Sequence, residues 1–340
     1  MKTCHKVLLA VLLSVFSLSA SAQNRDVAKA LVKEGITLHD AGKYNEAIAK
    51  YDEAIKADPN YSNGYYEKGF TLFSTGKGKD ALPCLEKVLK LDPQSPGAYD
   101  MIGSIYDDDK QTDKAIEYFQ KGLKIDSTYQ RLYYNMAITY YRLGKYADAE
   151  VSAIKAIKLD PKHASSQRVY AMTTYSEDKR GVSLLAWCSF LLLEPQTKRA
   201  EVANDYIQKI LNYGIKKTGE KSVTLSVSTS DMEGPNFLMP MAILTATSDK
   251  KNLTRADSLS LTLTKLFEIS GNFAGKKGDA FYKSFFSDYF KKLAATDNMT
   301  AFARLISLTI NKQENLQWFK DNNTKLSALE AWVGSTKREF

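Results

Sequence analysis

The chain has 340 residues, of which 44% are hydrophobic, 11% aromatic and 25% charged. This composition excludes a disordered or collagen-like chain and indicates a packed fold that is long enough for two domains. Lys and Arg outnumber Asp and Glu by 47 to 39, without the concentrated basic stripe of a nucleic-acid-binding surface, so no nucleic-acid partner is expected.

The start of the chain, positions 1–22, has the features of a secretory signal peptide. Lys2 and Lys6 precede an apolar stretch from Val7 to Leu18, and small residues at positions 20–22 precede Gln23. The stretch is shorter than the roughly 20 residues that a membrane-spanning helix needs, and no later segment is long and apolar enough. We therefore expect an exported bacterial protein, periplasmic or secreted, whose mature part is soluble and has no integral membrane segment. Because Gln23 stands where a lipoprotein would have Cys, a lipid anchor is not expected.

A period of about 34 residues runs through the first half of the mature chain. Small residues recur at Gly35, Gly69, Gly103, Ala137 and Ala171, and again at Ala47, Ala81, Ala115, Ala149 and Ser183. Larger side chains recur in the series Tyr51, Leu85, Phe119, Ala153 and Trp187, and a third small or proline series is Pro59, Pro93, Ser127, Pro161 and Pro195. Small residues let two antiparallel helices approach closely, larger ones fill the gaps, and Pro ends the second helix. The period therefore predicts stacked helix-turn-helix units.

These repeats resemble the tetratricopeptide repeat family. The pattern is carried by LVKEGITLHDAGKYNEAIAKYDEAIKADP in the first repeat and YYNMAITYYRLGKYADAEVSAIKAIKLDP in the fourth. The likeness covers about residues 28–195 as five repeats. It implies an all-α fold, in which a right-handed α-solenoid over residues 23–197 is followed by a helical C-terminal domain over 198–340.

Two of the five repeats depart from the family pattern. The third has Lys110 and Ser127 where the family prefers Gly and Pro. The fifth departs at Gln167, Thr174 and Ser183, and we expect it to be a degenerate repeat that caps the array.

The resemblance also implies a ligand surface, because the first helix of each repeat lines the concave face of such arrays. The family's groove positions fall here on Tyr66, Phe70, Phe73, Asp100, Asp107, Arg131, Tyr134, Ile138, Tyr141 and Arg142. Aromatic side chains and Arg dominate binding energy at interfaces, so we expect a protein or peptide partner in the cell envelope. In the alternative interpretation, several of these rings pack against a neighbouring repeat or the C-terminal region. Val32 and Ile36 replace the Lys and Asn with which some relatives grip a terminal carboxylate, so that mode is not expected.

Beyond Pro195 the repeat register fades. We expect helices over Arg199–Lys216, Asn236–Thr247, Ala256–Glu268, Asp279–Thr296, Met299–Asn311 and Glu314–Thr336. Alternation within Ser222–Ser230 is typical of a strand, either an extended segment on the helices or an edge open to a partner strand.

The helix Asp279–Thr296 is expected to be part of the core, because apolar residues cover about half its circumference. They are Phe281, Tyr282, Phe285, Phe286, Tyr289, Phe290 and Leu293, with Lys283, Ser284, Ser287 and Lys291 opposite. The alternative is a second docking surface.

The sequence contains no recognisable catalytic constellation. The segment Gly271–Lys277 is one residue too short between its glycines for a phosphate loop, and no Gly-x-Ser-x-Gly is present. Cleavage would leave Cys84 and Cys188, expected as free thiols, and no Cys or His lies at zinc-ligand spacing. We therefore expect a non-enzymatic interaction scaffold without catalytic residues, cofactor or metal. Two alternatives stay open: a glycan-binding module that uses exposed aromatic side chains, and an unusual hydrolase in the C-terminal half.

Overall fold

The computed structural model of the chain describes residues 23–217, 223–225, 236, 253–277 and 280–339. The predicted signal peptide and all but the first residue of the predicted helix Asn236–Thr247 lie outside these residues. The chain forms two compact units, one ending at Thr139 and one beginning at Tyr140. The predicted boundary at residue 197 therefore falls inside the second unit.

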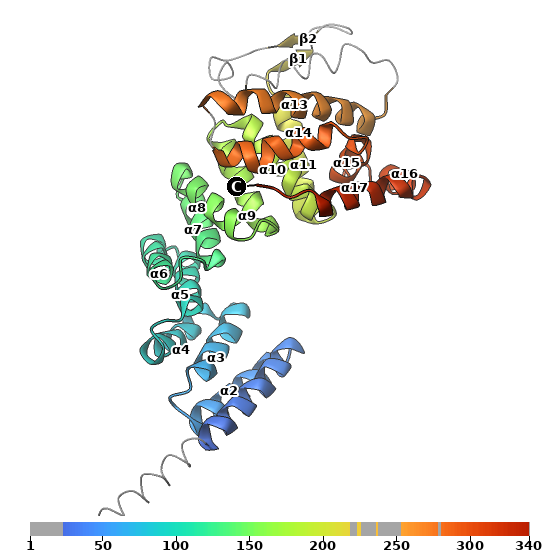
Figure 1. Ribbon diagram of the computed structural model, residues 1–340. Coiled ribbons are helices and arrows are strands. Elements are labelled where there is room, and N and C mark those ends of the chain that lie inside the picture. The colour runs from blue at the N-terminus through green and yellow to red at the C-terminus, as the bar shows by residue number, and fades with distance from the viewer. Residues whose placement is uncertain (1–22, 218–222, 226–235, 237–252, 278–279, 340) are drawn as a thin grey trace, which may run out of the picture. The chain divides into compact units, whose positions relative to one another are not determined.

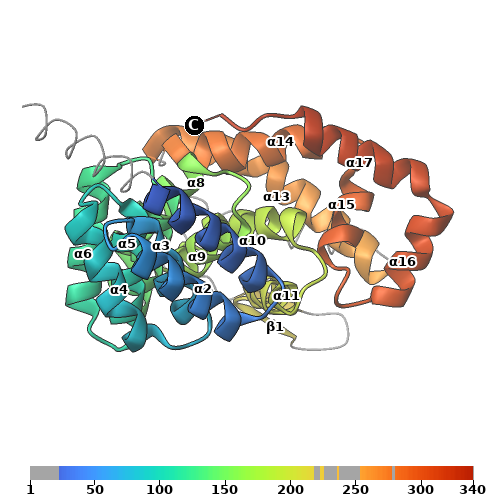
Figure 2. The same ribbon diagram turned by 90° about the horizontal axis from the view of Figure 1, so that it is seen from below.

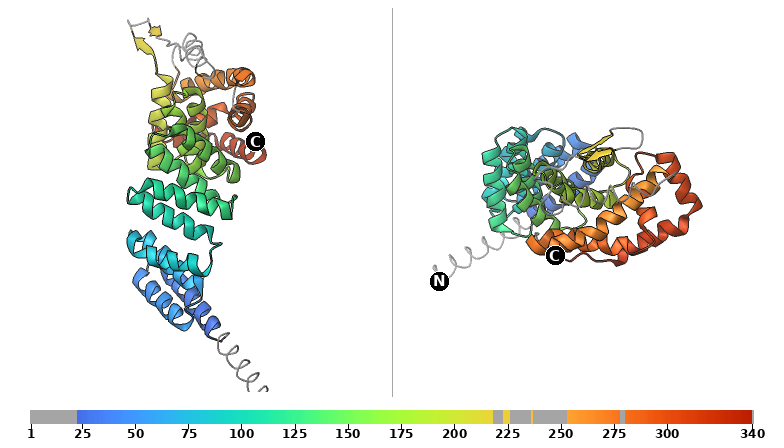
Figure 3. Two further views of the ribbon diagram at one scale, coloured as in Figure 1. Left: turned by 90° about the vertical axis from the view of Figure 1, so that its left-hand side faces the viewer. Right: turned by 90° about the horizontal axis from the view of Figure 1, so that it is seen from above.

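The first unit consists of helix pairs that follow one another along the chain (Figure 1, and Figure 3, left). A helix over residues 23–40 precedes α2 (Tyr44–Ala57), α3 (Ser62–Ser74), α4 (Gly78–Leu91), α5 (Pro96–Asp108), α6 (Thr112–Ile125) and the part of α7 (Gln130–Arg142) up to Thr139. The pairs α3 with α4 and α5 with α6 pack closely, and α4 packs on α5 of the next pair. The predicted helix-turn-helix repeats are confirmed.

Small and large residues of the repeat pattern meet inside each helix pair. A Cβ atom at Gly35 would lie 2.3 Å from the Tyr51 ring, and one at Gly103 would lie 2.4 Å from the Phe119 ring. Both rings are fully buried. Glycine is needed at these positions because the partner ring occupies the space that any side chain would take.

The turn inside each repeat uses one residue with left-handed backbone geometry. Gly42, Gly76 and Gly144 have φ angles of 75°, 78° and 70°, whereas Lys110 and Asp178 adopt 64° and 60° at the same place in the third and fifth repeats. Glycine adopts this region freely and other residues only at a cost. Lys110 therefore preserves the turn by accepting backbone strain.

The turn between repeats is fastened by an aspartate. The Oδ1 atoms of Asp58, Asp92, Asp126 and Asp160 each accept a hydrogen bond from the backbone N–H two residues later, at 2.8–3.1 Å. This local bond supports a turn in the same way with or without proline. The third repeat therefore keeps its turn although Ser127 replaces Pro.

The second unit adds further helices and one short hairpin to the last repeats. Its elements are α8 (Tyr146–Leu159), α9 (Ala164–Ser176), α10 (Arg180–Leu193), α11 (Lys198–Leu211), β1 (Ile215–Lys217), β2 (Val223–Leu225), α13 (Arg255–Lys277), the π-helical segment η3 (Tyr282–Ser287), α14 (Asp288–Ala294), α15 (Met299–Ile306), α16 (Lys312–Asp321) and α17 (Asn323–Ser335). Figure 2 shows α10 with the C-terminal helices α13, α14 and α15 beside it.

Helix α10, the second helix of the fifth repeat, is internal, so this repeat does not cap the array as we expected. Every residue from Arg180 to Leu191 is buried, and the helix packs against α9, α11, α15 and η3. Its sequence is apolar on all sides, which is typical of a helix enclosed by others. Tyr170 of α9 stacks on Phe286 of η3, with ring centroids 5.4 Å apart, so the C-terminal helices join the fifth repeat in one core.

Several predicted elements of the C-terminal region need correction. The helix expected over Ala256–Glu268 extends to Lys277, and the one expected over Met299–Asn311 ends at Ile306. The helix expected over Arg199–Lys216 ends at Leu211, and Ile215–Lys217 instead pairs antiparallel with Val223–Leu225 (Figure 3). The predicted strand therefore has a partner in the same chain, whereas the rest of Ser222–Ser230 lies outside the described residues. The single helix expected over Glu314–Thr336 is two helices, because Asn322 leaves the helical region with φ −131° and ψ 45°.

The aromatic helix is part of the core, as predicted, but it is not a continuous α-helix. All seven of its apolar side chains are buried. The N–H of Asp288 donates to the carbonyl of Lys283, five residues earlier, as in a π-helix. This wider turn shifts the face, so Ser287, predicted to be on the polar side, is buried with its Oγ 3.3 Å from that of Ser270.

Candidate functional site

The candidate site lies on the surface formed by the first helices of the repeats in the first unit: residues 23–40, α3, α5, and α7 up to Thr139. We call it the first-helix face. Eight predicted site residues belong to it: Tyr66, Phe70 and Phe73 on α3, Asp100 and Asp107 on α5, and Arg131, Tyr134 and Ile138 on α7. The three aromatic residues of α3 are half-buried, as are Tyr134 and Ile138, whereas Asp107 is only 6% exposed. Asp107 therefore contributes to the interior more than to the surface.

A buried carboxylate lies at the centre of this face. Asp100 is 1% exposed; its Oδ1 accepts a hydrogen bond of 2.7 Å from Asn135, and its Oδ2 lies 3.2 Å from Nε of Arg131. Asn135 also donates to Ser104 Oγ at 3.2 Å. Burial raises the pKa of Asp100, although Arg131 and Asn135 both favour the charged form. These contacts connect α5 to α7 through side chains of two successive repeats.

The Tyr66 phenol packs against Gly97, the second residue of α5, on the same side as this carboxylate. A Cβ at Gly97 would be 2.5 Å from the Tyr66 hydroxyl oxygen, so only glycine leaves room for the phenol against the backbone of α5. Burial is the main cause that raises the pKa of Tyr66 to about 12, with smaller contributions from Tyr129 and nearby carboxylates. The phenol is therefore neutral at physiological pH and can donate a hydrogen bond.

A second aromatic group joins the first repeat to α3. The His39 ring lies 5.2 Å from the rings of both Phe70 and Tyr44, and its Nδ1 is 2.8 Å from Thr71 Oγ1. This group fixes the position of Phe70, whose ring is half-buried.

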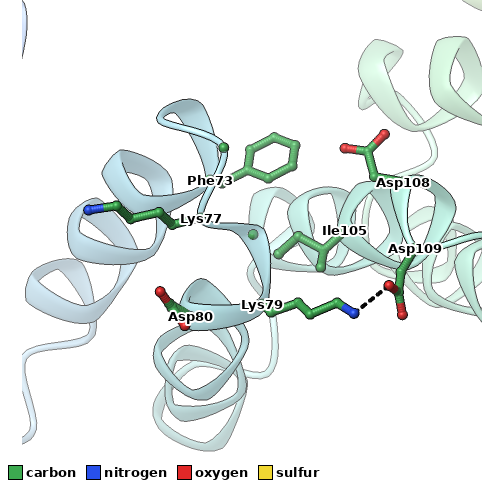
Figure 4. A pocket seen from close by; sticks show the side chains of 9 residues that line it. Phe73, Lys77, Lys79, Asp80, Ile105, Asp108 and Asp109 are labelled. Atoms are coloured by element: carbon green, nitrogen blue, oxygen red, sulfur yellow. Dashed lines mark ion pairs between the residues drawn. The ribbon is translucent and has the colours of Figure 1, made fainter.

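A hollow of about 470 Å³ opens at one edge of the first-helix face (Figure 4). It is lined by Phe73 at the end of α3, by the turn residues Gly76 and Lys77, by the start of α4, and by Ile105 and Asp108 of α5. In Figure 4 the Phe73 ring points into the space between the two repeats, and Lys79 pairs with Asp109 at 2.6 Å. The hollow can take an apolar side chain against Phe73 and Ile105.

The two remaining predicted site residues, Tyr141 and Arg142, belong to the second unit. The Tyr141 ring lies 5.6 Å from that of Tyr146, and Arg142 is exposed. Tyr175, on the first helix of the fifth repeat, lies 4.8 Å from Tyr206, which stacks on the buried Trp187. The structure therefore uses these last rings partly in packing.

Sequence reasoning missed Asn135 and Glu67. Both occupy the sixth position of the first helix of their repeats, directly after the predicted residues Tyr134 and Tyr66. The regular repeat spacing could have found them as a pair of polar residues on the first-helix face. The partners of Asn135 could not be found in this way, because Asp100 and Ser104 belong to the preceding repeat.

The described part of the chain offers no evident metal site. Within it, no group of three or more His, Cys, Asp or Glu side chains is placed to hold an ion. Cys84 is half-buried, Cys188 is fully buried, and both are free thiols. The described helices also include none whose length and hydropathy would suit a bilayer crossing.

The paired helices, the stacking of successive pairs and the exposed first-helix face define a helical-repeat protein. Tetratricopeptide repeat models match residues 35–76, 62–95, 96–129 and 131–163. The repeats over residues 35–163 are therefore tetratricopeptide repeats.

Comparison with whole proteins adds only structural similarities. No curated protein sequence matches the chain. Among solved structures, MamA protein shares 21% identity over 57% of this chain and 99% of its own, with a TM-score of 0.43. PilF of Pseudomonas aeruginosa shares 17% identity over 56% of this chain and 90% of its own, with a TM-score of 0.49. YrrB, described as a TPR protein with an unusual peptide-binding site, shares 19% identity over 55% of this chain and 97% of its own, with a TM-score of 0.43.

Proposed function

We propose that this protein is a non-enzymatic interaction scaffold, and that its first-helix face binds a peptide segment of another protein. The tetratricopeptide fold supports an interaction scaffold in general. The observation that carries the peptide proposal is the row of half-buried rings Tyr66, Phe70 and Phe73, which lies between a buried polar centre and a hollow. Rings that are fixed in position lose little entropy on binding, and they are typical energetic centres of interfaces.

The proposed place of action is the cell envelope of a bacterium. The support is the basic start, apolar stretch and small residues of positions 1–22. A fusion of residues 1–30 to alkaline phosphatase, which is active only after export, tests this proposal. Activity equal to that of a fusion lacking these residues would refute it.

Affinity capture tests the peptide-binding proposal. Purified protein beginning at Gln23 is immobilised and exposed to an envelope extract of the source bacterium, and retained proteins are identified by mass spectrometry. We expect the Tyr66→Ala, Phe70→Ala and Tyr134→Ala triple variant to lose a partner that the native protein retains. Tyr118→Ala, which removes a half-buried ring from the second helix α6, is the control and should retain it. Circular dichroism verifies that both variants are folded, and undiminished capture by the folded triple variant would contradict the proposal.

A further inference from the structure

The carboxylates near the first-helix face are not equally neutralised. Asp100 has Arg131 and Asn135 as partners. Glu67, half-buried on α3, and Asp40, exposed at the end of the helix over residues 23–40, have neither an ion pair nor a hydrogen bond among the described residues. Burial, and secondly the charge of Asp40, raise the pKa of Glu67.

His39, which directly precedes Asp40, contacts Phe70 and Thr71, about one turn after Glu67 on α3. The two carboxylates therefore lie on adjoining stretches of neighbouring first helices, and neither has a described cation.

The nearest basic residues in the sequence are engaged elsewhere. Lys68 pairs with Asp52 at 2.6 Å, and Lys43 lies 3.7 Å from Glu46. Both pairs link these lysines to α2, the second helix of the first repeat. The chain therefore supplies no described counterion to Asp40 and Glu67.

The surroundings of this pair suit a long cationic side chain. Tyr66 directly precedes Glu67, and Phe70, held by His39, follows on the same helix. Aromatic rings favour a neighbouring ammonium or guanidinium group, and apolar surface favours the methylene stem of Lys or Arg. The two carboxylates would bind the charged end of such a side chain, and the aromatic rings would contact its methylene stem.

Building on the proposed function, we infer that the bound peptide carries a Lys or Arg side chain whose charged end is held by Asp40 and Glu67. The argument is charge complementarity: a cation between the two carboxylates removes their repulsion and compensates the burial of Glu67. A peptide that presents an acidic group here would add a third negative charge. The same peptide would place an apolar side chain near Phe70 and Phe73.

A selection from a phage-displayed library of random dodecapeptides tests the inference. The protein beginning at Gln23 is the target, and the enriched peptides are synthesised with a fluorescent label for anisotropy titration. We expect enriched sequences to contain Lys or Arg near an aromatic or aliphatic residue. Glu67→Gln and Asp40→Asn should each weaken binding by about tenfold. Glu86→Gln, which neutralises an exposed carboxylate on α4, should leave binding unchanged.

A second comparison replaces the basic residue of the peptide by norleucine. The loss should be large on the native protein and small on Glu67→Gln, because the two changes remove the same interaction. Peptides that depend on Tyr66 and Phe70 but are insensitive to Glu67→Gln would overturn the inference and leave the proposed function standing. Failure to enrich any peptide that depends on Tyr66 and Phe70 would overturn both.

Discussion

At the scale of single residues, the burial of Asp100 disfavours the charged form of its carboxyl group. Its pKa is raised despite the nearby Arg131, so the charged form costs stability in the folded state. Such a cost is typical of groups that are retained for function rather than for folding.

The variant Asp100→Asn measures this cost. Asn keeps an acceptor for Asn135 and removes the buried charge, so we expect a higher melting temperature at about pH 7. In the folded native protein the pKa of Asp100 lies above its ordinary value of 3.8. The free energy of unfolding of the native protein therefore falls as the pH rises from 3.8 to the folded-state pKa, and it stays lower at higher pH. The difference between the two proteins should therefore vanish at about pH 3. Asp108→Asn, an exposed change on the same helix, is the control, and a lower melting temperature of Asp100→Asn at about pH 7 would contradict this account.

Gly103 gives a second prediction for a single position. Its Cβ in Gly103→Ala would lie 2.4 Å from the buried Phe119 ring, so we expect the variant to lose about 2 kcal/mol of unfolding free energy. The loss should be smaller in a Phe119→Ala background, where the ring is absent. The fourth repeat already has alanine at both equivalent positions, Ala137 and Ala153. Urea unfolding of the four proteins gives the coupling energy. Additivity within about 0.5 kcal/mol would show that the contact does not explain the glycine.

The residues of the candidate site were predictable only in part. The repeat positions identified Asp100 and Arg131 from one sequence, because these positions recur once in every repeat. Their pairing, and the participation of Asn135, depend on how neighbouring helices place side chains against each other. A pattern within one helix carries no information about such contacts.

At the scale of the element, Lys110 tests how the turns of the repeats are determined. Its φ angle of 64° would cost a glycine nothing, while its side chain is exposed. We expect Lys110→Gly to raise the unfolding free energy by about 0.5 kcal/mol, the relief of strain being offset partly by the entropy of glycine in the unfolded chain. Lys110→Ala keeps the strain and removes the side chain, so it should bring no gain. Thermal unfolding followed by circular dichroism distinguishes them, and an equal gain in both variants would assign the effect to the side chain.

Elements were predictable where local signals determine them. The repeat helices follow from small residues, from proline positions and from the aspartates that accept turn hydrogen bonds. The hairpin was missed because Ile215 continues an apolar pattern of α11, and its pairing with Leu225 is a contact between separate segments. The π-helical turn was missed because an inserted residue leaves the composition of the face unchanged, although it turns Ser287 inward.

At the scale of the whole molecule, each compact unit has a core of its own. In the second unit Arg304, 4% exposed, lies 3.2 Å from Asp257 and 3.3 Å from Glu314, and so joins α13, α15 and α16. Such contacts connect residues far apart in the sequence, and no repeat pattern indicates them. The location of the C-terminal helices beside α10 was therefore beyond sequence reasoning, and the fifth repeat was expected to cap the array instead.

Arg338, near the C-terminus, connects the last segment of the second unit to α14 and α10. The half-buried Arg338 lies over Tyr289, with its guanidinium carbon 4.0 Å from the ring centroid, and donates a hydrogen bond to Ser189 of α10. Ser189 in turn donates to Gln167 of α9. Burial lowers the pKa of Arg338 to about 10, so the group remains charged at neutral pH.

We expect Arg338→Ala to lower the unfolding free energy of the second unit by about 2 kcal/mol, because the substitution removes the contacts of the guanidinium group with the aromatic rings and its hydrogen bond to Ser189. Lys337→Ala, an exposed change of the neighbouring residue, should have little effect. Hydrogen exchange measured by mass spectrometry locates the change: peptides from η3, α14 and α17 should exchange faster, while peptides from residues 23–139 keep their native rates. Faster exchange throughout both units would show that they unfold as one cooperative body, and the independence of the two cores would then have to be abandoned.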